Sequence, residues 1–223
     1  MVMDFFRGST ESGLEEVEKT LTQMLLDGRD VYDTAMHSVF GGGHRKELKQ
    51  EIRGTDRGIN LAQKEVRRSL VVHTAVGASV DFPLALTYMS IVKDAERVGD
   101  YAKNIYDLAR YGISFEGADD AAELARYRDA VSQLIADAAE VFAARDVGAA
   151  QRLIDKADGF LDEYDAQVKA AIRSEGPTSE AVGRALYARY LKRITAHIMN
   201  MMTSLVVPVD RLDYYDEAPE DRA

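Results

Sequence analysis

Hydrophobic residues recur every three or four positions along almost the whole chain, which is the spacing of amphipathic helices. Six stretches of this kind follow one another, with apolar stripes that begin near Leu14, Leu48, Leu84, Leu124, Ala150 and Val182. The first helix is expected to begin at a cap, Thr10 or Ser12, and to end at three consecutive glycines from Gly41. The third is expected to begin at Asp81, with Pro83 in its first turn. The pattern predicts an all-α protein.

The second group of three helices follows the same order as the first, which indicates an internal duplication. Asp56 on the second helix aligns with Asp158 on the fifth, and Glu96 on the third helix aligns with Lys192 on the sixth. Three amphipathic helices can bury their stripes against one another, so we predict two tandem three-helix bundles. The expected division is repeat one over residues 1–113, repeat two over 114–211 and a disordered acidic tail over 212–223.

Charge and composition narrow the classes of function. The chain has 28 Lys and Arg against 38 Asp and Glu, a net charge of −10, which argues against nucleic-acid binding. The same net charge opposes direct attraction to anionic lipid, so membrane association is expected only through a protein partner. The absence of cysteine excludes disulfides and thiol nucleophiles. No apolar run of about 20 residues and no signal peptide are found, so a cytoplasmic protein is expected.

Polar residues at helical spacing are the candidates for chemistry. Asp56 and Asn60 are four residues apart, as are Glu96 and Asp100, so each pair shares one helix face. Two stacked carboxylates repel unless a cation separates them, and hard oxygen ligands suit Mg, Mn, Ca or iron. Because the acidic pair lies away from the apolar stripe, a metal is expected on the outer surface, bridging neighbouring helices. The alternative is an ordinary solvated face, since 30% of the residues are charged.

Gly99 lies between the two acidic residues in the middle of a helix, where glycine costs about 1 kcal/mol relative to alanine. A backbone without Cβ allows a neighbouring helix or a ligand to approach closely. An enzyme with a di-metal carboxylate centre normally uses Glu-x-x-His pairs, and the chain contains none. A phosphate-binding glycine loop is absent as well, which argues against a nucleotide hydrolase.

One segment of the third helix carries a family resemblance. It reads Glu96-Arg97-Val98-Gly99-Asp100-Tyr101-Ala102-Lys103-Asn104-Ile105. This run resembles the signature E-R-[IV]-G-D-x-A-x-N-I of the PhoU family of phosphate-uptake regulators, and the segment at Asp56 resembles that family's D-x-x-[IV]-[DN] pattern. The resemblance covers roughly residues 14–207. It implies a six-helix repeat fold and a non-enzymatic regulator that binds a phosphate transporter, a phosphate sensor histidine kinase or both. It also implies a cytoplasmic homodimer, with a peripheral position at the inner face of the membrane left open.

The resemblance further implies metal ligands, carried over residue by residue. The candidates are Asp56, Asn60, Glu96 and Asp100 in repeat one and Asp158 and Asp162 in repeat two. The expected cofactor is one divalent or iron-type ion at repeat one, either Mg, Mn, Fe or Zn. Repeat two departs from the pattern, because Lys192 replaces the glutamate and Ala196 the aspartate. We therefore expect an ion pair between Lys192 and Asp158 in place of a metal there.

Two alternatives stay open at this point. The chain could be a metal-binding helical scaffold, or a carboxylate–metal enzyme, with no link to phosphate. The stretch from Leu84 to Tyr88 also lacks the acidic-Leu-Arg triplet of many PhoU proteins, which leaves the identity of the transporter or kinase open.

Overall fold

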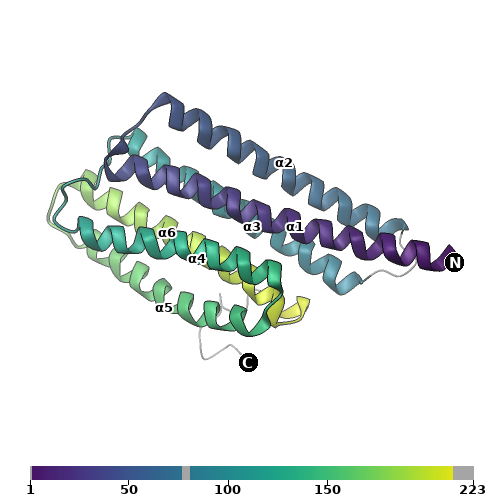
Figure 1. The fold of residues 1–223 in the computed structure, drawn as a ribbon. Helices are drawn as coiled ribbons and strands as arrows, with labels where there is room; N and C mark the ends of the chain where they lie inside the picture. The colour runs from purple at the N-terminus through teal and green to yellow at the C-terminus, as the bar shows by residue number, and fades with distance from the viewer. Residues whose placement is uncertain (1, 77–80, 213–223) are drawn as a thin grey trace.

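The computed structural model describes residues 2–76 and 81–212, with side chains described for 13–75 and 81–212, and this part of the chain is helical without strands (Figure 1). The six long helices are α1 (Val2–His37), α2 (Lys46–Val76), α3 (Phe82–Arg110), α4 (Ala121–Ala144), α5 (Val147–Ile172) and α6 (Thr178–Val206). Helices α1, α2 and α3 pack against one another, and so do α4, α5 and α6. The prediction of an all-α protein with two tandem three-helix bundles is confirmed.

Most helix boundaries follow the expected local signals. The carboxylate of Asp81 accepts a hydrogen bond of 3.0 Å from the backbone N–H of Leu84, which caps α3, and Pro83 lies in the first turn. Helix α1 ends in a π-helical turn, η1 (Ser38–Gly42), in which Gly41 has a φ of 117°. Glycine reaches such a positive φ without a Cβ clash, so the glycine run ends the helix as predicted.

The expected start of α1 is wrong. The helix begins at Val2, so Ser12 lies inside it and does not act as its cap. No proline interrupts the residues before Ser12, and the backbone N–H groups of a continuing helix bond to preceding carbonyls rather than to a serine hydroxyl. The predicted tail lies outside the described residues except for Leu212. The repeat boundary at residue 113 falls in the link between α3 and α4 and stays a prediction.

The two bundles share one hydrophobic core because α3 packs on α6 and α1 packs on α4. The Tyr32 hydroxyl on α1 donates a hydrogen bond of 3.0 Å to the backbone carbonyl of Arg128 on α4. At one end of the bundles, the ring of Phe115 lies 5.5 Å from that of Phe40 and 4.9 Å from that of Tyr187, measured between centroids. Helix α3 therefore has neighbours in both repeats, and its polar residues face other helices rather than water alone.

Candidate functional site

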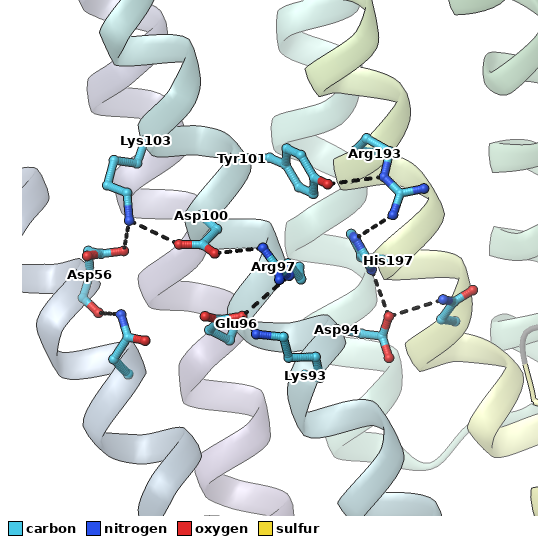
Figure 2. A network of polar contacts seen from close by, with 12 residues as sticks. Asp56, Lys93, Asp94, Glu96, Arg97, Asp100, Tyr101, Lys103, Arg193 and His197 are labelled. Carbon is cyan, nitrogen blue, oxygen red and sulfur yellow. Dashed lines mark hydrogen bonds and ion pairs between the residues drawn. The ribbon is translucent and has the colours of Figure 1, made fainter.

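The carboxylates predicted as metal ligands in repeat one lie in a network of ion pairs along α3 (Figure 2). Lys103 links two of them, since its Nζ is 2.8 Å from Oδ1 of Asp56 on α2 and 3.0 Å from Oδ1 of Asp100 on α3. Burial alone would lower the pKa of Lys103, but the hydrogen bonds to Asp56 and Asp100 outweigh burial and raise that pKa above its usual value. The ammonium group thus separates the two carboxylates and ties α2 to α3.

Pairs of cations and carboxylates continue along α3 toward its N-terminus. Lys93 Nζ lies 2.9 Å from Oε2 of Glu96, and Arg97 donates a hydrogen bond of 3.0 Å to Oδ2 of Asp100. The expectation that this acidic pair lies on the outer surface is wrong for Glu96, whose side chain is only 8% exposed. The helical wheel places Glu96 opposite the stripe that packs in repeat one, but α3 contacts helices on several sides, so that face is covered as well.

Asn60 does not point its amide toward the carboxylates. Its Nδ2 donates a hydrogen bond of 2.8 Å to the main-chain carbonyl of Asp56 on the same helix. Gly99 serves helix packing, because a Cβ built on it would lie 2.8 Å from Cδ1 of Ile59 on α2. The close approach predicted for this glycine is therefore made by a neighbouring helix.

In repeat two the predicted ligands are arranged differently. Asp158 is half-buried and Asp162 is exposed, both on α5. Lys192 on α6 forms an ion pair with Asp165 on α5, whose Oδ2 lies 2.6 Å from Nζ. The predicted ion pair between Lys192 and Asp158 stays a prediction. Asp158, Asp162 and Asp165 are spaced so that they share one face of α5. The replacement of glutamate by Lys192 thus gives an interhelical ion pair.

The carboxylates of repeat one are engaged with lysines in the described structure. Among the described residues, no group of three or more His, Asp or Glu side chains converges in a way that could hold a metal ion. Asp56, Glu96 and Asp100 each have a lysine within 3.0 Å, so their charges are already balanced. A metal at this place would have to displace Lys103. Metal ligation by these residues stays a prediction.

A second polar cluster joins the two repeats between α3 and α6, and sequence reasoning missed it. Oδ1 of the buried Asp94 accepts a hydrogen bond of 3.1 Å from Asn200 Nδ2 and lies 2.7 Å from Nδ1 of His197 (Figure 2). Tyr101 stacks on the His197 ring with centroids 5.6 Å apart, and Arg193 Nε donates to the Tyr101 hydroxyl at 3.3 Å. His197 has no acidic partner on its own helix, so local spacing gave no indication of the pair.

The alignment of the two repeats could have indicated this cluster between α3 and α6. The alignment that places Glu96 over Lys192 also places Tyr101 over His197 and Asp94 over Tyr190. In the structure, Tyr101 contacts both His197 and Tyr190, with ring centroids 5.6 and 6.2 Å apart. Equivalent positions of the two repeats therefore meet at the α3–α6 interface, as expected when two copies of a unit face each other.

The fold and this interface define a class of protein: a tandem repeat of three-helix bundles joined through the third helix of each repeat. Residues 21–109 match the family model described as "PhoU domain". The resemblance of the first half of the chain to the PhoU family is therefore confirmed.

Two solved structures share the fold over most of their length. The phosphate transport system regulatory protein PhoU from Streptococcus pneumoniae superposes with a TM-score of 0.76 at 18% identity, covering 88% of this chain and 94% of that one. PhoU from Pseudomonas aeruginosa gives a TM-score of 0.74 at 22% identity, covering 87% of this chain and 96% of that one. No curated protein matches the sequence. None of the helices in the described residues is long and apolar enough to cross a membrane.

Proposed function

We propose that the protein is a non-enzymatic regulator of phosphate uptake. The observation that carries this proposal is the PhoU domain match over residues 21–109, within a fold that superposes on a phosphate transport regulatory protein over 88% of the chain. The family match and the structural match are two independent lines of support, because the first rests on the sequence pattern and the second on the arrangement of the helices. Together they favour phosphate control over an unrelated helical scaffold.

The arrangement of charged side chains supports a regulatory rather than a catalytic role. The carboxylates Asp56, Glu96 and Asp100 are paired with lysines of the same bundle, and the Asp56–Lys103 pair holds α2 against α3. Proton transfer requires an acid or base that can reach a substrate, whereas these groups are engaged in helix packing. What the fold offers instead is a set of long, rigid helical surfaces.

The proposed mechanism is a brake that acts through partner binding. The chain would bind the cytoplasmic face of a phosphate transporter, a phosphate sensor histidine kinase or both, and limit phosphate entry or signalling when phosphate is plentiful. The shared core and the Asp94–His197 contact join the two repeats, so a partner that binds one repeat meets a surface fixed by both. A cytoplasmic homodimer is part of the proposal.

Two experiments in the source organism test this function: deletion of the gene, and capture of binding partners with a tagged copy of the protein. Cells without the gene are expected to take up radiolabelled phosphate faster in phosphate-rich medium than the parent strain, and a plasmid copy is expected to restore the parental rate. A tagged copy is expected to capture a phosphate transporter or its sensor kinase from cells grown in high phosphate, and to capture less after starvation. Unchanged uptake in the deletion strain, with no such partner captured, would contradict the proposal.

Metal binding in repeat one is a second candidate, favoured by one observation. Asp56 and Asp100 converge from two helices on a single point, which in the described structure is the Nζ of Lys103. If Mg, Mn, Fe or Zn binds there, elemental analysis of the purified protein is expected to find it, and the double variant E96A/D100A is expected to lose it while keeping its helix content. An equal metal content in that variant would reject the site.

A further inference from the structure

Positive charge is concentrated on one face of α2, although the chain as a whole carries a net charge of −10. The exposed cationic residues of this face are Lys46, Arg53, Arg57, Lys64, Arg67 and Arg68, called here the basic face of α2. At about 100° per residue, these six positions fall within an arc of about 100°. The four carboxylates of the helix lie outside that arc. The charge of the molecule is therefore segregated rather than evenly spread.

The basic face is not neutralised within the protein. In the described part of the chain, none of its six residues forms an ion pair, and Asp56, the carboxylate of α2 closest to this arc on a helical wheel, is bonded to Lys103. Helix α2 packs on α1 and α3 and lies at the upper edge of the molecule in Figure 1. The positive charge of these six side chains is therefore not balanced by carboxylates in the described part of the chain.

Aliphatic side chains stand among the cations. Leu61 is 59% exposed and Val71 is 58% exposed. Leu61 precedes Lys64 by three residues and Val71 follows Arg67 by four, so each aliphatic side chain is a neighbour of a cation on the helix surface. On the solvent side of α2, cations and aliphatic side chains therefore share one surface, on which cations can contact lipid phosphates and aliphatic groups the acyl boundary.

We propose that the basic face of α2 docks directly on a membrane surface rich in anionic lipid headgroups. Lipid phosphates match the uncompensated cations, and the boundary of the acyl chains accepts Leu61 and Val71. From Lys46 to Arg68 the face extends about 33 Å along the helix, at 1.5 Å per residue, which suits a flat, extended surface. Nucleic acid would match the charge alone and leave the exposed aliphatic residues without an apolar contact.

From the net charge of −10 we expected membrane association only through a protein partner, and the segregation of charge on α2 revises that expectation. At physiological ionic strength the field of an exposed charge is screened over about 8 Å, so carboxylates on the far side of the molecule contribute little at the basic face. Each cation close to an anionic surface strengthens binding by about fivefold. The proposal is independent of the phosphate function, because it concerns where the protein lies and not what it controls.

Vesicle flotation with the full chain tests the docking. The probes are vesicles of neutral phosphatidylcholine and vesicles that also contain 30 mol per cent phosphatidylglycerol, in low and in high salt. The wild-type protein is expected to float with the anionic vesicles in low salt and to remain unbound with the neutral ones. The variant R57E/K64E/R68E is expected to bind the anionic vesicles at least tenfold more weakly.

A matched control variant distinguishes an effect of the basic face from an effect of the net charge of the protein. The variant R152E/R173E/R189E changes the net charge by the same amount at three exposed arginines of repeat two, and it is expected to bind like wild type. Circular dichroism is expected to show that both variants keep their helix content. Failure of wild type to float with anionic vesicles in low salt overturns the proposal, and so does an equal loss in the control variant. Binding to soluble polyglutamate but not to vesicles would assign the face to an acidic protein and also overturn it.

Discussion

Gly99 on α3 and Ile59 on α2 lie so close that a Cβ on the glycine would be 2.8 Å from Cδ1 of the isoleucine. Both positions are buried, and Ile59 is only 1% exposed. The glycine therefore sets the distance between the second and third helices at the level of the ion-pair network. Its helix-propensity cost of about 1 kcal/mol is offset by this close packing.

Substitution of Gly99 by alanine is expected to lower the free energy of unfolding by about 1 kcal/mol. The gain in helix propensity, about 1 kcal/mol, opposes an overpacking cost of about 1–3 kcal/mol. In the background of Ile59→Val, which removes Cδ1, the same substitution is expected to be neutral or stabilising. A double-mutant cycle followed by urea denaturation measures the coupling. Additive effects of the two substitutions would show that the two residues do not limit the packing.

Substitution of Lys103 by methionine is expected to destabilise the protein and to create affinity for a divalent cation. Loss of the ammonium leaves Asp56 and Asp100 facing each other, at a cost of about 1–2 kcal/mol because the pair is partly exposed to solvent. Titration calorimetry with Mn²⁺ is expected to detect tighter binding than in wild type. The exposed Lys169→Met serves as the control, and equal Mn²⁺ binding by both variants would contradict the prediction.

Two buried tyrosines are expected to respond differently to removal of the hydroxyl. Tyr32 donates to the Arg128 carbonyl at 3.0 Å, so Tyr32→Phe is expected to lower the free energy of unfolding by about 1 kcal/mol. The hydroxyls of Tyr164 and Thr195 are buried without a well-formed hydrogen bond, so Tyr164→Phe is expected to be neutral or stabilising. Thermal and urea unfolding of the two variants checks the ranking, and the reverse order would show that the Tyr164 hydroxyl has a strong partner.

The stability of the link between α4 and α6 is expected to depend on pH in the acid range. Arg184 bonds both oxygens of Asp120, at 2.7 and 2.9 Å, and these hydrogen bonds hold the pKa of Asp120 below its usual value. The stabilisation is therefore fully present above the unfolded-chain pKa of about 3.9 and is lost as the pH falls through the lower folded-state value.

At neutral pH, Asp120→Asn is expected to cost roughly 1 kcal/mol, because both side chains are partly exposed. The difference from wild type is expected to shrink as the pH falls below about 4. The neighbouring Asp119, which is exposed, provides the control variant Asp119→Asn. Urea unfolding between pH 3 and pH 7 gives the comparison. A difference that stays constant over this range would refute the assignment of the pH dependence to Asp120.

The sequence by itself determined the helices, their order and most of the signals that separate them. Asp81 and the glycines from Gly41 act through local backbone geometry, which depends on residues a few positions apart. The apolar stripes determined which face of each helix is buried within its own bundle, and the duplication followed from their order. The close approach at Gly99 was foreseen for the same reason, since a glycine inside a helix has a local cost that packing must offset.

Only the tertiary structure decided which polar side chains meet. Glu96 is buried because α3 packs on helices of both repeats, and a helical wheel contains no information about a second bundle. Asp94 pairs with His197 from more than a hundred residues away, and Lys103 lies between Asp56 and Asp100. Such contacts depend on how whole helices are placed, and that placement is set by the summed packing of the core and not by the spacing of residues along one helix.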